Sequence, residues 1–301
     1  MATRREILKT MIFAGLAARF ARASEGRLPL AFSTLGCPGW TWAQILDFAE
    51  KHGYAAVELR GMLGSMDLPG RPEFAAEKIA ESKKEMAGHG LQIACVSSST
   101  SLHVADAQER AAQIADAKRF IDLAEKLEAP YVRVFGNEIR GPREAVVARV
   151  AAGLHELGEY AGARNVAVII ESHGDFTDSA TLGEVLSRAD SKHAALLWDA
   201  YHTFDSSQEQ PEFTVERLGK WIRHTHLKDS SPDGKGRKYV LTGRGDIPVK
   251  RQMAALVKAG YRGYYCFEWE KVWHPDIAEP EIAIADYAKV AAGYLQEVKG
   301  S

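Results

Sequence analysis

The chain has 301 residues, of which 46% are hydrophobic and 26% charged, and its formal net charge is −2. This near-neutral balance argues against a protein built to hold a nucleic-acid backbone, and the mean hydropathy of −0.23 argues against a polytopic membrane protein. A chain of this length buries a large core without disulfides or structural metals, so we expect a soluble enzyme or binding protein.

The first 23 residues differ in pattern from the rest of the chain. Arg4 and Arg5 precede an apolar run over residues 11–18, which is too short to span a bilayer, and Ala21-Arg22-Ala23 is a small-x-small cleavage pattern. This order predicts a twin-arginine signal peptide over 1–23 and a periplasmic or secreted mature protein; the alternative is an amphipathic helix on a cytoplasmic protein. Removing 1–23 takes away five basic residues and one acidic residue, which changes the net charge to −6.

Residues 24–301 alternate between short apolar runs and stretches with helical spacing. We expect strands at 28–33, 55–59, 92–97, 131–135, 166–171, 194–199, 222–227 and 264–268. We expect helices from a capping box at Thr41 and Gln44 to residue 53, and at 74–89, 105–127, 143–163, 181–189, 249–259 and 282–298, with a weaker one between 211 and 219. Eight strand–helix units predict an α/β fold with a single (β/α)8 TIM barrel over 24–301. A doubly wound sheet is the alternative, but the first strand lacks its glycine-rich phosphate turn.

Four consecutive strands end in residues that can bind a metal ion. Glu171, Asp199 and Glu268 close the fifth, sixth and eighth strands, and His226 lies near the end of the seventh. Taken singly, each has an ordinary structural interpretation as a solvated carboxylate or a hydrogen-bonded imidazole. Because the carboxyl ends of barrel strands meet at one face, we expect all four to bind one divalent cation. Oxygen ligands with one imidazole favour Mn²⁺, with Mg²⁺, Co²⁺ or Zn²⁺ as alternatives.

The segments around these four positions resemble a known family. Residues 170–176, 198–202, 224–229 and 267–271 are similar to the sugar phosphate isomerase/epimerase family, in the xylose isomerase-like TIM barrel superfamily, which includes ketose 3-epimerases and inosose dehydratases. The resemblance covers most of 28–298. It implies that Glu171, Asp199, His226 and Glu268 are the metal ligands, that Glu171 and Glu268 are the catalytic acid/base pair on opposite faces of the substrate, and that His202 contacts the substrate.

The expected reaction starts with removal of a proton next to a carbonyl group. A carboxylate takes the proton, and a bound metal ion stabilises the resulting enediolate. The expected function is therefore a metal-dependent sugar isomerase or epimerase. The ketose 3-epimerases carry a substrate-binding arginine where this chain has Pro232, and Lys228-Asp229 is more similar to the inosose dehydratases. A dehydratase or lyase, acting on an inosose or eliminating from a keto-glycoside, therefore stays open as the alternative.

Other polar and aromatic residues are candidates for the substrate pocket. The substrate-binding candidates are His202, His173, Lys228, His103, Trp40 and Arg244. The loop over 230–247 is interpreted as a mobile lid or a solvated connection, and Gly243-Arg244-Gly245 lies where TIM barrels often bind phosphate. Export and a charge of −6 nevertheless favour an unphosphorylated sugar. We also expect a structural pairing of Glu58 with Arg133 inside the barrel.

Two further functions are remote alternatives. The first is an apurinic endonuclease of the same superfamily, which needs an additional Asp-x-His after the seventh strand that residues 237–242 lack. The second is a non-catalytic sugar-binding protein. We expect no nucleic-acid partner and no stable membrane span after signal removal, and homo-oligomerisation is left open. Cys37, Cys95 and Cys266 are interpreted as buried thiols, with a Cys37–Cys266 disulfide also left open.

Changing Arg4 and Arg5 to lysine should keep the protein in the cytoplasm, because the arginine pair is the element of the signal that directs this export route. Immunoblotting of periplasmic and cytoplasmic fractions measures the outcome, with Arg19→Lys as the matched control. Continued export of the double variant contradicts the signal assignment.

Overall fold

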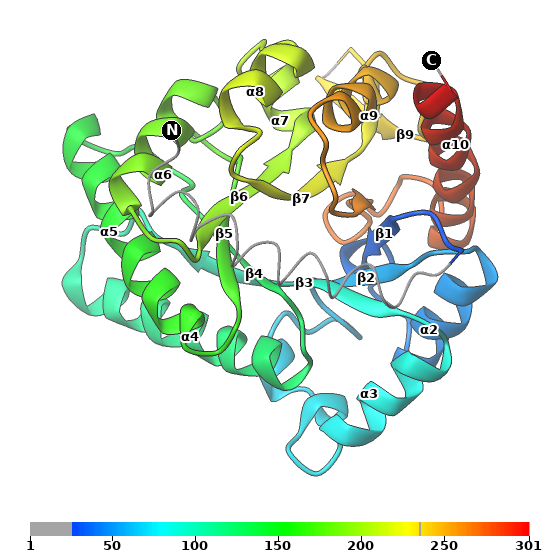
Figure 1. Cartoon of the computed structure of the whole chain (residues 1–301), viewed down its shortest axis with the longest axis horizontal. Coiled ribbons are helices and arrows are strands. Elements are labelled where there is room, and N and C mark those ends of the chain that lie inside the picture. The colour runs from blue at the N-terminus through cyan, green and yellow to red at the C-terminus, as the bar shows by residue number, and fades with distance from the viewer. Residues whose placement is uncertain (1–25, 235, 301) are drawn as a thin grey trace.

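Eight parallel strands close into a barrel in the computed structural model, which describes residues 26–234 and 236–300 (Figure 1). The signal peptide expected over 1–23 lies outside these residues. The barrel strands are β1 (Leu30–Ser33), β2 (Ala56–Leu59), β3 (Gln92–Ser101), β4 (Tyr131–Phe135), β5 (Ala167–Glu171), β6 (Ala194–Asp199), β7 (Ile222–Leu227) and β10 (Tyr265–Phe267). Each strand pairs with its neighbour in chain order, and β10 pairs with both β7 and β1. The predicted single TIM barrel is confirmed.

Helices surround the barrel. They are α2 (Trp42–Lys51), α3 (Ile79–Gly88), α4 (Ala107–Lys126), α5 (Arg143–Gly162), α6 (Ser179–Ala189), α7 (Ala200–Asp205), α8 (Pro211–Leu218), α9 (Val249–Lys258) and α10 (Pro280–Gly300). The predicted capping box at α2 is present, since the Thr41 side chain accepts from the Gln44 amide and the Gln44 side chain accepts from the Thr41 amide. The sequence did not predict α7. No helix in the described part of the chain is long and apolar enough to cross a membrane.

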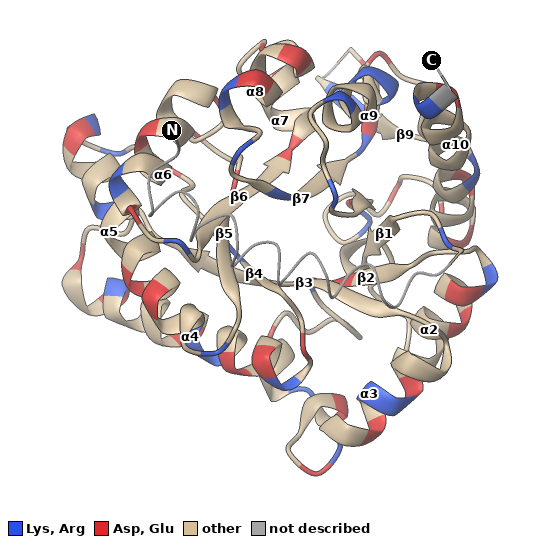
Figure 2. Ribbon diagram, in the orientation of Figure 1, with Lys and Arg blue, Asp and Glu red and all other residues tan. Residues whose placement is uncertain are grey.

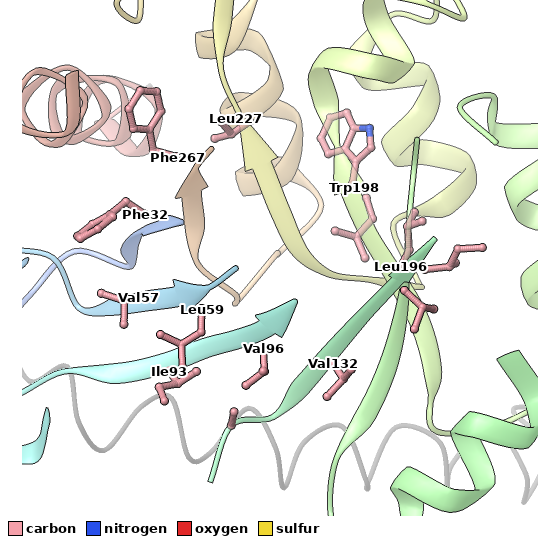
Figure 3. Packing of buried hydrophobic residues seen from close by; sticks show 14 of the residues in the cluster. Phe32, Val57, Leu59, Ile93, Val96, Val132, Leu196, Trp198, Leu227 and Phe267 are labelled. Carbon is pink, nitrogen blue, oxygen red and sulfur yellow. The ribbon is translucent and has the colours of Figure 1, made fainter. Parts of the chain in front are cut away.

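The main hydrophobic core lies between the strands and the helices. Alternate strand residues point outward, and Figure 3 shows Phe32, Val57, Leu227 and Phe267 among those that fill this layer. The residues between them point into the barrel. A separate buried cluster consists of small side chains and one tyrosine: Ala31, Ala55, Ala56, Ala94, Cys266 and Tyr264. Many charged residues lie on the outer helices, as Figure 2 shows for α2, α3 and α4. Charged residues at inward positions of strands are removed from water and need a particular explanation.

All three cysteines are buried and free. Cys266 on β10 pairs in register with Ala31 of β1, six residues before Cys37, which lies beyond the end of β1. The two sulfur atoms are therefore at different levels of the barrel. The interpretation as buried thiols is confirmed, and a Cys37–Cys266 disulfide is not formed.

A short antiparallel hairpin follows β7 within the loop that was predicted as a lid or a solvated connection. It consists of β8 (Asp229–Pro232) and β9 (Arg237–Val240). The Asp229 carboxylate accepts hydrogen bonds from the backbone amides of Ser230, Gly243, Gly245 and Ile247 at 2.8, 2.8, 3.0 and 3.2 Å. Gly245 is required here, because a Cβ atom would lie 2.2 Å from Asp229 Oδ1. The glycine turn that suggested phosphate binding thus holds a carboxylate of its own chain.

Replacing Phe267 with alanine should lower the free energy of unfolding by about 3–5 kcal/mol. Its ring is fully buried between Tyr287 and Trp269, at centroid distances of 4.5 and 5.5 Å, and its loss leaves a cavity behind β10. Urea denaturation monitored by circular dichroism measures the change. Ile282→Ala, at a position that is 55% exposed, is the control and should change stability by less than about 0.5 kcal/mol. Equal effects of the two substitutions contradict this assignment of the core.

Candidate active site

The four predicted metal ligands lie together at the carboxyl-terminal ends of the strands. One ligand atom from each of Glu171, Asp199, His226 and Glu268 lies within 4.8 Å of the others, and all four residues are buried. Asp199 and Cys266 are the register partners of His226 on the flanking strands, and Glu268 follows β10 directly. The parallel register therefore brings these side chains to one level of the barrel.

The His226 ring is held by one nitrogen and presents the other to three carboxylates. Its Nε2 lies 2.8 Å from Glu58 Oε2. Its Nδ1 lies 3.1 Å from Glu268 Oε1, 3.4 Å from Glu171 Oε1 and 3.9 Å from Asp199 Oδ2. This Nδ1 is buried and has no hydrogen-bond partner with acceptable geometry in the described part of the chain. Burial lowers the pKa of His226, but Glu268, Glu58 and Glu171 outweigh it and raise that pKa well above its ordinary value.

Glu58 fixes two imidazoles from inside the barrel. Its Oε2 lies 2.7 Å from Nε2 of His224, in addition to the contact with His226, and its Oε1 accepts from the Ser33 hydroxyl at 3.0 Å. Burial alone would raise the pKa of Glu58, but His226 and His224 hold it well below the ordinary value. An ionised Glu58 that accepts from Nε2–H directs Nδ1 of His226 toward the three carboxylates, as carboxylates behind histidine ligands commonly do.

The expected pairing of Glu58 with Arg133 is corrected by the structure. Arg133 Nη1 lies 3.1 Å from Glu171 Oε2, and the guanidinium lies over the Phe135 ring at 3.8 Å. Arg133 lies on β4, which neighbours β5 and its terminal Glu171, whereas Glu58 lies on β2, where its register partner is Ser33. Strand adjacency therefore decides which carboxylate the guanidinium neutralises.

The two oxygens of Asp199 have separate tasks. Oδ1 accepts from the amides of Tyr201 and His202 at 3.0 and 3.2 Å and so caps α7. Oδ2 lies 2.6 Å from Lys228 Nζ. Burial raises the pKa of Asp199 to about 6, although Lys228 acts in the opposite direction.

Lys228 is a buried cation among three carboxylates. Its Nζ contacts Asp199 and Glu268 and lies 2.8 Å from Glu270 Oε1. Burial lowers the pKa of Lys228, but these carboxylates outweigh it and raise the pKa well above its ordinary value. The Tyr239 hydroxyl, supplied by β9, donates to Glu270 at 3.1 Å. Sequence reasoning missed Tyr239 because nothing in the local pattern indicates that the hairpin folds back onto the strand ends.

His202 and His173 lie beside this group. His202 Nε2 is 3.7 Å from Asp199 Oδ2, and the two imidazole rings are 5.0 Å apart. His173 Nδ1 is 3.1 Å from the Asn137 side-chain oxygen. Burial, with Lys228 and His173, lowers the pKa of His202 to about 3, so its imidazole is neutral. Two of the predicted substrate residues are thus adjacent to the ligand cluster.

Three other predicted substrate residues make their contacts elsewhere. The Trp40 indole donates to Glu281 of α10 at 3.3 Å and packs on Phe48 of α2. Arg244 is exposed and lies 3.2 Å from Asp286 of α10, and the His103 ring lies 3.9 Å from a carboxylate oxygen of Glu138. Helix packing thus holds the indole and an exposed ion pair holds the guanidinium, and the substrate contacts expected for Trp40, Arg244 and His103 stay predictions.

A divalent cation fits the four converging residues. Three carboxylates and one imidazole are the donor set that Mn²⁺, Mg²⁺ and Zn²⁺ take in proteins. The buried Nδ1 of His226 faces the three carboxylates, and a cation bound there would replace its proton. A second grouping of Glu58, His224, His226 and Cys266 fits less well, since Glu58 and the two imidazoles already bond to one another. The first grouping is therefore the candidate metal centre.

The chain is similar to proteins of known fold and named activity. The family described as xylose isomerase-like TIM barrel matches residues 46–291. An inosose dehydratase from Geobacillus thermodenitrificans is 27% identical over 165 residues, which cover 49% of this chain and 53% of the relative. A fructoselysine 3-epimerase from Shigella flexneri is 27% identical over 161 residues, which cover 50% and 56%. The chain thus matches about half the length of these curated relatives.

A solved structure extends the likeness in fold over most of the chain. The crystal structure of the IOLI protein with a bound zinc atom superimposes with a TM-score of 0.72 at 18% sequence identity, and covers 90% of this chain and 99% of that one. At this level of identity the likeness concerns the fold alone.

Replacing Glu58 with glutamine should weaken divalent-metal binding about 10- to 100-fold, because the neutral amide no longer fixes the His226 tautomer. Competition with a fluorescent chelator measures the affinity, and circular dichroism checks that the variant folds. The control is Glu50→Gln, whose carboxylate lies on the outer surface 2.7 Å from His89. An affinity equal to that of the unmodified protein rules out this role for Glu58.

Proposed function

The chain belongs to the xylose isomerase-like TIM barrel family, and from this premise we propose that it is a divalent-metal-dependent sugar isomerase or epimerase. The names of its relatives, an inosose dehydratase and a fructoselysine 3-epimerase, support a small sugar as the substrate. The proposal includes an unphosphorylated substrate and a periplasmic or secreted mature chain of residues 24–301, which rest on the sequence alone.

One observation carries the proposal. The buried Nδ1 of His226 has no hydrogen-bond partner among the described residues, faces Glu171, Asp199 and Glu268, and is set in that direction by Glu58. Without a cation, the surrounding carboxylates favour a proton on this imidazole. A divalent cation can take the place of that proton, because a metal ion binds the deprotonated nitrogen and is attracted by the same three carboxylates. A divalent cation held by these four residues would polarise a substrate carbonyl and stabilise the negative charge of an enediolate. Its identity is proposed as Mn²⁺, with Mg²⁺, Co²⁺ and Zn²⁺ as alternatives.

The chain's own carboxylates supply the proton transfer. Burial would raise the pKa of Glu171, but Arg133 and His226 lower it to about 2. His226 and Lys228 likewise outweigh burial and keep the pKa of Glu268 well below its ordinary value. Both groups are therefore carboxylates, the form that accepts a proton. We assign one to remove the proton next to the carbonyl. For inversion the other must first take up a proton, which it then returns to that carbon on the opposite face.

A dehydratase is the second candidate, and Lys228 favours it. Its ammonium group lies beside Glu268 and Glu270, and the Tyr239 hydroxyl donates to the same Glu270 oxygen, Oε1. An ammonium group next to the proton-abstracting carboxylate can protonate a departing β-hydroxyl group. The same initial proton abstraction would then lead to loss of water instead of inversion.

Replacing Glu171 or Glu268 with glutamine should lower turnover about 10²- to 10⁴-fold, because an amide does not accept the proton. The assay incubates the metal-loaded protein with ketoses, inososes and 3-keto-glycosides in D₂O. Exchange of a carbon-bound proton is followed by NMR, and mass spectrometry separates isomerised from dehydrated products. Glu216→Gln, on the exposed side of α8, is the matched control.

Metal analysis accompanies each variant, so that loss of the cation is distinguished from loss of the proton acceptor. Normal turnover by both glutamine variants with metal bound contradicts the assignment of these two residues. Absence of metal-dependent exchange with every substrate contradicts the proposed function itself.

A further inference from the structure

Arg60 is a buried cation that none of the preceding roles uses. It directly follows β2, and its backbone amide donates to the Thr34 hydroxyl at 2.9 Å, which fixes the chain at the strand exit. Glu58 contacts His224 and His226 inside the barrel, and Arg60 comes two residues later, at a bend in the chain. Its side chain is buried, and the charges that act on it are those of Arg133, Glu171, Glu268 and Glu58, so it lies near the carboxyl-terminal mouth of the barrel.

The Arg60 guanidinium has almost no partner of its own. The residue is 6% exposed. Among the residues that the structure describes, its side chain donates one hydrogen bond, from Nη1 to Met66 Sδ at 3.2 Å, and no carboxylate lies within 4.0 Å. A thioether is a weak acceptor, whereas a guanidinium carries five N–H donors. A buried charge in this condition is costly unless a further group binds it.

The nearby carboxylates are already committed to other cations. Glu58 accepts from two imidazoles, Glu171 pairs with Arg133, and Glu268 contacts Lys228. Burial and the nearby Arg133 lower the pKa of Arg60. Three carboxylates are close enough to raise it in part, namely those of Glu171, Glu268 and Glu58. Arg60 is thus adjacent to the proposed acid/base pair without forming an ion pair with it.

We propose that Arg60 binds a carboxylate group of the substrate, so that the preferred substrate is an acidic keto sugar and not a neutral ketose. This rests on the proposed function, because the carbonyl of the same molecule must reach the metal centre. The geometry of the guanidinium agrees with it. The carboxylates nearest to Arg60 are already paired with other cations, so its N–H donors stay available, and a guanidinium fork matches a carboxylate with two parallel hydrogen bonds.

Two matched ligand pairs test this inference on the metal-loaded protein: 5-keto-D-gluconate with L-sorbose, and D-glucuronate with D-glucose. Within each pair the molecules differ by a carboxylate in place of a hydroxymethyl group. Isothermal titration calorimetry should give the acidic member of at least one pair an affinity about 10- to 100-fold higher, as expected for hydrogen bonds to a charged group. Arg60→Met should abolish this preference, and Arg60→Lys should leave part of it.

The control is Arg251→Met, an exposed arginine paired with Glu212, which should keep the full preference. Circular dichroism and metal content verify that each variant folds and binds metal. If Arg60→Met does not fold, the difference in affinity between acidic and neutral ligands on the unmodified protein tests the inference. Equal binding within both pairs, or a preference that survives in Arg60→Met, overturns the inference. If proton exchange depends on metal while L-sorbose and D-glucose bind best, only the role of Arg60 fails. If there is neither metal binding nor exchange, the proposed function fails with it.

Discussion

Four carboxylates lie buried inside the barrel, and the free energy needed to remove them from water is the constraint around which the site is built. Each is matched by cationic groups on other strands. Glu58 contacts His224 and His226, and Glu171 pairs with Arg133, while Lys228 serves both Asp199 and Glu268. These pairings also orient the side chains. Because Glu58 holds Nε2 of His226, the opposite nitrogen faces the other three carboxylates. The same ion pairs that neutralise the buried carboxylates therefore also set the geometry of the candidate metal centre.

The barrel and its four converging residues could be predicted because both depend on local order in the sequence. A strand in a TIM barrel is a short apolar run, and the residue at its end lies at the carboxyl-terminal face wherever the strand sits in the circle. Glu171 and Asp199 are the last residues of β5 and β6, and Glu268 follows β10 directly. No knowledge of distant contacts was needed to place them together. The inward direction of Glu58 also follows from the alternation along β2, although its partners do not.

The pairings across the barrel could not be predicted, because they depend on register and on loops that fold back. Arg133 reaches Glu171 on the adjacent strand and not Glu58, whose register partner is Ser33. The glycine turn after β9 has the sequence of an anion-binding segment, yet Asp229, at the start of β8, takes its amides. Trp40 lies in a loop after the first strand, where a pocket residue is plausible, but α10 offers Glu281 to its indole. In each case a residue distant in the sequence decides the role.

Lys228 connects the metal centre to the choice of substrate. Its ammonium group contacts Asp199 Oδ2 and Glu268, two of the groups that a divalent cation would also use, and the residue is fully buried. Two positive centres that share the same oxygens repel each other, and the repulsion is strong in a region from which water is excluded. Negative charge on a bound substrate would lessen that repulsion, whether it lies on a carboxylate or develops on an enediolate oxygen. Lys228 would therefore favour a bound anion whenever a divalent cation occupies the site.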